Sequence, residues 1–192
     1  MSSQSNIESN DPAHVIAATQ HWLTRAVIGL NLCPFAKAVY VKQQIRYVVS
    51  EARDFEAVIT ELEQALRQLA DCDAQVIDTT LLILPDVLSN FDDFNDCLHL
   101  TDRLLKSMRL QGVLQIASFH PHYQFAGNQA GDIENYTNRA PYPILHLLRE
   151  ASIDRAVEAF PDAAGIYERN EATLRELGHA GWQTLMSQTD LG

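Results

Sequence analysis

The sequence predicts an α/β protein: a layered sandwich built on a small, mostly parallel β-sheet, with an extra helical region at the C-terminal end. Helical and strand-like patterns alternate from residue 12 to residue 118, and the strands are far enough apart for helical crossovers, which join parallel strands. The second strand is apolar almost throughout, as expected when both faces are covered. A ferredoxin-like α+β fold is the alternative, but it needs two strands between the central helices, where the sequence provides one.

The helices are predicted from apolar residues at helical spacing. Asp11 offers an N-cap and Pro12 suits the first helical position, so a first helix is expected over about 12–30. A short helix starting at Pro34 would place Cys33 at its N-cap. Further helices are expected over about 51–70, 91–110, 144–150 and 162–186, with a short turn from Ser152 and an interruption at Gly178.

The strands are predicted from short runs of β-branched and apolar residues. These runs cover residues 45–49, 79–84 and 113–118. After the third strand, residues 127–143 form a long loop, and a long loop inside a compact domain is usually functional.

The length and composition predict one domain over residues 11–192, after a disordered tail over residues 1–10. The net charge of −11 disfavours binding to nucleic acids and anionic membranes, which requires clustered Lys and Arg. No apolar stretch approaches the roughly 20 residues of a membrane helix. There is no nucleotide-binding motif, and the sequence leaves the oligomeric state open.

The cysteines and the N-terminus indicate a cytoplasmic protein. Cys33, Cys72 and Cys97 are odd in number, widely spaced and without a CxxC pair, which argues against a disulfide framework. The first ten residues are polar and lack the features of a signal peptide.

A metal site is the leading functional hypothesis, and it centres on His120-Pro121-His122 after the third strand. If this segment is extended, the two imidazoles share one face, with Cα atoms roughly 6–7 Å apart. Two such ligands suit a divalent transition metal, Zn or Fe, in an enzyme with hydrolase-like or oxygen chemistry. The candidates for a third ligand are His146, Cys33, Asp132 and Glu134; His146 is flanked by leucines, so a core histidine is the alternative.

A thiol enzyme is the second hypothesis, either a hydrolase or a group-transfer enzyme. A helix N-terminus would stabilise a Cys33 thiolate, and His120 or His122 would accept its proton. Asn128 or Asn138 would orient the imidazole.

A non-catalytic domain that binds a small, anionic molecule is the third hypothesis. Arg139 would pair with a carboxylate or phosphate, unless it instead clamps loop carbonyls. Asn128 and Asn138 would be further polar anchors, and the aromatic walls would come from Tyr123, Phe125, Tyr136 and Tyr142.

Three segments carry a family resemblance: NLCPFAK at 31–37, FHPHYQFAG at 119–127 and YTNRAPYPILHLLRE at 136–150. With them the chain resembles a bacterial family known as domain of unknown function 1415, over nearly everything after residue 11. The resemblance implies a single-domain bacterial protein of undetermined function. It implies no activity, cofactor or catalytic residue.

Overall fold

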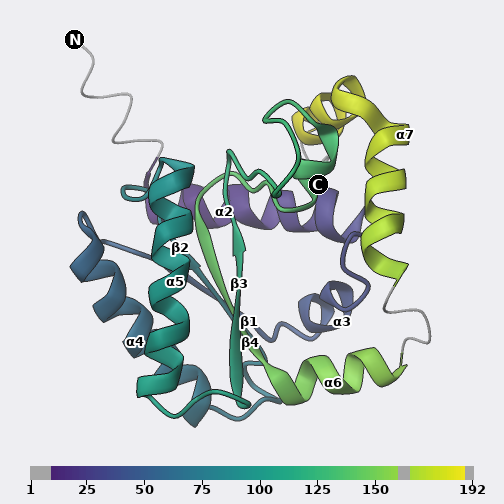
Figure 1. Cartoon of the computed structure of the whole chain (residues 1–192). Coiled ribbons are helices and arrows are strands. Elements are labelled where there is room, and N and C mark those ends of the chain that lie inside the picture. Colours follow the sequence, from purple (N-terminus) through teal and green to yellow (C-terminus); the bar gives the residue numbers. More distant parts are fainter. Residues whose placement is uncertain (1–9, 160–164, 189–192) are drawn as a thin grey trace.

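The computed structural model describes residues 10–159 and 165–188 (Figure 1). These residues form a mixed α/β fold with one open four-stranded sheet. The elements are α2 (Pro12–Trp22), the π-helix η1 (Leu23–Ile28), α3 (Ala36–Val41), β1 (Ile45–Val49), α4 (Phe55–Asp71), β2 (Thr79–Ile83), α5 (Phe91–Ser107), β3 (Leu114–Phe119), the 3-10 helix η2 (Ile133–Thr137), β4 (Ile144–Arg149), α6 (Glu150–Ala159) and α7 (Ile166–Ser187).

The prediction of a disordered tail falls mostly outside the described residues. Its last residue, Asn10, is part of the fold, because its side-chain amide donates a hydrogen bond to Asp86 Oδ1 (2.5 Å). None of the helices in the described ranges is both long and apolar enough to cross a membrane.

The sheet has the order β1-β2-β4-β3. The pair β1–β2 is parallel, while β4 runs antiparallel to both β2 and β3. The three strands predicted from the sequence therefore run in the same direction, and the two crossovers between them are helical as expected. The prediction of a mostly parallel sheet is nevertheless wrong, because β4 lies between β2 and β3 and makes two of the three pairings antiparallel.

The source of this error is the segment 144–150, predicted as a helix and observed as strand β4 followed by the start of α6. Ile144, Leu145 and Leu147 are fully buried in the sheet. A short apolar run of this kind fits a central strand and a buried helix equally well, since both bury nearly all side chains. The ferredoxin-like alternative does not describe the chain either, because only β2 lies between α4 and α5.

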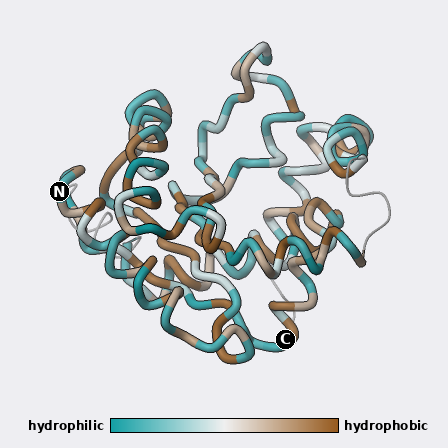
Figure 2. The backbone as a smooth tube through the Cα atoms, turned by 60° about the horizontal axis from the view of Figure 1, so that its bottom comes forward, coloured by the Kyte–Doolittle hydropathy of each residue, from teal (hydrophilic) through white to brown (hydrophobic). Residues whose placement is uncertain are grey.

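Helices α4 and α5 cover one face of the sheet, on the left in Figure 1. Asp54 caps α4 by accepting a hydrogen bond from the backbone N–H of Ala57, and Asn90 caps α5 in the same way. Both helices are amphipathic. In Figure 2, hydrophobic and hydrophilic residues recur along the turns of the helices. Their apolar sides pack on one face of β2 and β4 through Leu62, Leu66, Phe94, Leu82, Leu145 and Leu147.

The other face of the sheet packs on α2 and η1. Leu81 and Ile83 alternate with Leu82 along β2, so they point to this second face. They join a separate buried cluster with Val15, Trp22, Ala26 and Ile144. Helices α3 and α6 lie on the same side of the sheet (Figure 1). Both faces of the sheet are thus covered near its centre.

Candidate functional site

The His-Pro-His segment forms a tight turn at the end of β3, so the expectation of an extended segment is wrong. The backbone N–H of Tyr123 donates to the carbonyl of His120 (3.1 Å), which closes the turn. The side chain of His120 is fully buried and that of His122 is exposed. The two rings lie 5.9 Å apart, but they do not present a shared face to solvent.

His120 uses both ring nitrogens to hold the backbone. Nδ1 accepts a hydrogen bond from the N–H of His122 (3.0 Å), so Nε2 carries the proton and donates to the carbonyl of Leu88 (3.1 Å). The ring packs against Phe91 and Phe94 of α5. Burial is the main cause that lowers the pKa of His120, and the neutral ring fits these contacts. His120 therefore ties the end of β3 to the start of α5.

Two of the loop residues proposed as substrate anchors donate hydrogen bonds to backbone carbonyls of the protein. Arg139 donates to the carbonyls of Tyr123 (3.2 Å) and Ala130 (2.5 Å), and it stacks on the ring of Tyr136. Asn138 donates to the carbonyl of Ser118 (3.1 Å). The clamp of loop carbonyls, which was the alternative for Arg139, is the arrangement observed.

The remaining loop candidates are tied down in the same way. Asn128 donates to Asn135 Oδ1 (3.2 Å), and the ring of Tyr123 packs against Phe125 (5.0 Å between centroids). Sequence reasoning missed Asn135, which is fully buried and organises the loop. It accepts from the N–H of Phe125 (3.1 Å) and donates to the carbonyl of Gln129 (2.7 Å).

The three proposed histidine ligands, His120, His122 and His146, do not come together. His146 pairs with Leu81 in the sheet and lies on the α2 face, whereas His120 packs against α5 on the other side. Asp132 accepts a hydrogen bond from the backbone N–H of Gln129, and Glu134 forms an ion pair with Arg175. In residues 10–159 and 165–188, no three His, Cys, Asp or Glu side chains are arranged to hold a metal ion. A metal-binding or catalytic role for His120 and His122 stays a prediction.

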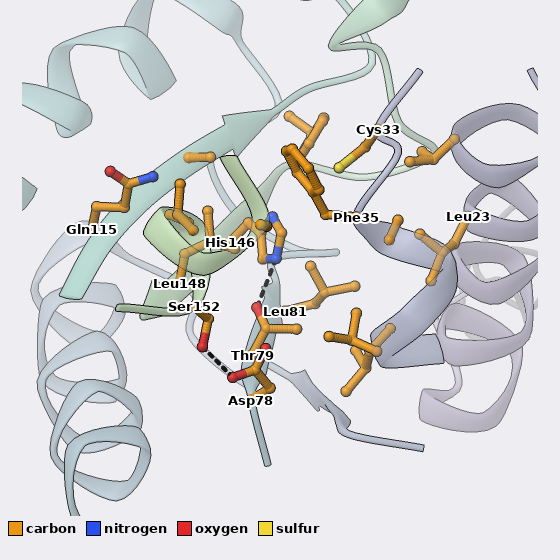
Figure 3. Close-up of a pocket in the computed structure, with 18 of the residues that line it drawn as sticks. Leu23, Cys33, Phe35, Asp78, Thr79, Leu81, Gln115, His146, Leu148 and Ser152 are labelled. Atoms are coloured by element: carbon orange, nitrogen blue, oxygen red, sulfur yellow. Dashed lines mark hydrogen bonds between the residues drawn. The ribbon is translucent and has the colours of Figure 1, made fainter. Parts of the chain in front are cut away.

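A cavity of about 310 Å³ lies on the α2 face of the sheet, and this cavity is the candidate site (Figure 3). It is enclosed by the sheet, η1, α3 and α6, and its wall is mostly apolar. The apolar side chains include Leu23, Val27, Phe35, Leu81, Phe119 and Leu148, and the polar ones are Cys33, Asp78, Thr79, Gln115, His146 and Ser152. The volume is at the lower end of the range for small-molecule sites.

His146 provides a hydrogen-bond acceptor inside this cavity. The Thr79 hydroxyl donates its only proton to the carbonyl of Leu147 (2.7 Å), so it must accept from His146 Nε2 (2.7 Å). The proton of the neutral ring is therefore on Nε2, and Nδ1 has a free lone pair. Nδ1 makes no hydrogen bond within the described residues. In Figure 3 this nitrogen lies on the side of the ring away from Thr79, toward Phe35 and Cys33.

Burial alone lowers the pKa of His146 to about 4. The apolar wall of the cavity disfavours the charged imidazolium, and no carboxylate partner compensates for it. His146 is thus a neutral acceptor at physiological pH. The ring of His146 is partly buried among the leucines of β4 and also lines a cavity, and a ligand-binding role for it stays a prediction.

Cys33 lines the same cavity, but it is not at a helix N-terminus. The N-cap of α3 is Phe35, two residues later. Burial raises the pKa of the Cys33 thiol, and nearby backbone N–H groups of Phe35 and Ala36 lower it less. The expected thiolate is therefore not favoured by the protein alone. The carbonyl of the preceding residue, Leu32, accepts a hydrogen bond from Asn170 of α7 (2.9 Å), which fixes the segment.

Three polar residues of the cavity had no signal in the sequence. Thr79 begins a buried strand, Asp78 precedes it, and Ser152 was predicted only to begin a short turn. Ser152 Oγ donates to Asp78 Oδ1 (2.5 Å) across 74 residues of sequence. The pairing of β2 with β4 brings these residues together, and that pairing was not predicted.

The comparison with known families gives one match. A family described as "Protein of unknown function (DUF1415)" matches residues 14–184, which is most of the chain. No curated protein and no solved structure shows significant similarity to it. The match includes all three segments on which the family resemblance was based.

Proposed function

Because the chain belongs to the DUF1415 family, whose function is unknown, we propose a function from the cavity itself: the protein binds a small, mostly apolar molecule between its sheet and helices α3 and α6. This proposal keeps the third hypothesis from the sequence and moves the site. The ligand lies at His146 and Cys33, not in the loop around Arg139.

The observation that carries the proposal is the free Nδ1 of His146 within an apolar wall. Nδ1 has no hydrogen-bond partner within the described residues, and the surrounding apolar wall offers it none, so a ligand that donates one hydrogen bond would supply that partner. Pockets that bind small molecules commonly combine apolar walls with a few placed polar groups. The expected ligand therefore has an apolar body and one hydroxyl or N–H group.

The size of the cavity limits the ligand. A volume of about 310 Å³ equals that of roughly ten water molecules in the liquid. A compact molecule of about ten non-hydrogen atoms fits such a space. Linear or aromatic alcohols of that size are suitable probes.

Thermal unfolding with 1-octanol tests the proposal, with octyl methyl ether as the probe that lacks the donor. We expect octanol to raise the melting temperature more than the ether, since a ligand that binds only the folded state stabilises it. Ala156→Phe fills the cavity from α6 and should abolish the effect. Ala151→Phe adds the same side chain at an exposed position of α6 and should keep it. Equal octanol responses in these two variants would contradict the proposal.

A second candidate function is covalent thiol chemistry at Cys33, and one observation favours it. Cys33 and His146 line the same cavity, and His146 Nδ1 is unprotonated. This imidazole takes the place of His120 or His122 as the base of the Cys-His hypothesis. The ligand would then be an electrophile, and the thiol proton would pass to Nδ1.

Alkylation by iodoacetamide at neutral pH separates the two candidates. Burial raises the pKa of Cys33, so without assistance it should react more slowly than Cys72, which lies in a surface turn. Thiol chemistry predicts the reverse order, and it predicts that His146→Gln removes the advantage of Cys33. A slow Cys33 in the wild type leaves ligand binding as the function.

A further inference from the structure

The cavity adjoins a second, more open depression on the protein surface. Both are lined by Phe35, Val39, Asp78, Ser152 and Ala156, which form the boundary between them. The depression extends outward between α3 and α6. A ligand in the cavity can therefore continue into it.

The depression is locally basic, although the chain carries a net charge of −11. Two cations line it, Lys42 after α3 and Arg155 of α6, against one carboxylate, Asp78. The local formal charge is thus +1. Lys42 forms no ion pair within the described residues.

Hydrogen bonds fix one of these cations at the boundary. Arg155 Nη2 donates to Ser152 Oγ (3.0 Å), and Ser152 Oγ donates to Asp78 Oδ1 (2.5 Å). The Asp78 carboxylate is therefore already engaged by a neutral hydroxyl. The positive charges of Lys42 and Arg155 remain available to a ligand.

Building on the ligand-binding function proposed above, we infer that the ligand is a monocarboxylate. Its apolar body occupies the cavity, and its carboxylate lies in the depression between Lys42 and Arg155. A single negative charge balances the local charge of +1, whereas a phosphate monoester would exceed it. Arginine suits a carboxylate because its planar donors match the two oxygens.

Isothermal titration with octanoate and 1-octanol tests this inference. Octanoate has about the size that the cavity accepts, and octanol has the same apolar body without the charge. In Lys42→Gln/Arg155→Gln we expect octanoate to bind roughly threefold to tenfold more weakly, and octanol to bind unchanged. Raising the salt concentration should weaken octanoate binding to the wild type only.

The control is Arg103→Gln/Lys106→Gln, which changes the net charge equally at exposed positions of α5, on the other side of the sheet. It should leave octanoate binding unchanged. If octanol binds but octanoate affinity does not respond to Lys42→Gln/Arg155→Gln, the inference is wrong and the proposed function stands. If neither octanol nor octanoate binds, both the inference and the proposed function are wrong. Tighter binding of octyl phosphate than of octanoate would overturn the assignment to a carboxylate.

Discussion

Two histidines of this chain show how one residue type acquires different roles. Both ring nitrogens of His120 make hydrogen bonds, one to the backbone of the turn and one to the backbone of the segment before α5. Only one ring nitrogen of His146 makes a hydrogen bond within the described residues, to Thr79, and the other nitrogen faces the cavity. The motif that was most conspicuous in the sequence thus holds the structure together, and a histidine among leucines is the better candidate for binding.

At this scale we predict that protonation of His146 destabilises the protein in acid. Its pKa is about 4 in the folded state against 6.5 for the free side chain, so the unfolded chain takes up the proton first. Stability is then complete above pH 6.5 and falls as the pH drops toward 4, by about 3 kcal/mol for His146. Urea unfolding across this range measures the loss, and His146→Gln should flatten the curve. Because the pKa of His120 is also lowered, the free energy of unfolding of that variant should still depend on pH to a smaller extent. Identical pH dependence in the two proteins would contradict the assignment.

At the scale of elements, β4 connects the parts of the fold. It pairs with two strands, carries His146, and ends at Arg149, next to α6. Arg149 Nη2 donates to the carbonyls of Leu69 and Cys72 at the end of α4 (2.6 Å each) and to Ile77 before β2 (3.1 Å). One side chain therefore satisfies carbonyls that the helix itself leaves unpaired.

Arg149→Met should lower the free energy of unfolding by about 2–4 kcal/mol. The substitution leaves several partly buried carbonyls without a hydrogen-bond donor, while it keeps the length of the side chain. Arg67→Met is the matched control, since Arg67 lies on the exposed side of α4 and, among the residues that the structure describes, pairs with Glu63 alone. That change should cost less than about 1 kcal/mol. Chemical denaturation of both variants gives the comparison. If the two losses were equal, the carbonyl clamp would not stabilise the end of α4.

At the scale of the whole molecule, the direction of the crossovers decides where a cavity can form. The chain moves across the sheet from β1 to β2 to β3, and right-handed crossovers in one direction place their helices on one face. Helices α4 and α5 pack on that face. The other face is covered by α2, η1, α3 and α6, which arrive from both ends of the sequence, and the cavity lies beneath them.

The sequence predicted local structure well. The strands at 45–49, 79–84 and 113–118, the N-cap at Asp11 and the interruption of α7 at Gly178 are confirmed within a few residues. It failed at 144–150, where hydrophobicity has no period, and at the extended His-Pro-His segment. Of the residues that line the cavity, Cys33 and His146 were already candidates in the sequence, but the sequence did not place them together.

By itself, the sequence determined the first three strands and most of the helices, because periodicity, caps and breakers act over a few neighbouring residues. It also determined the family, through three short segments. The tertiary structure alone decided that β4 inserts between β2 and β3, that the loop histidine and Arg139 bind backbone, and that His146 faces a cavity with Cys33. The position of β4 and the cavity depend on strand pairing between segments more than 60 residues apart, such as Thr79 with Leu148. Such pairing is set by the packing of the whole chain, and no local pattern records it.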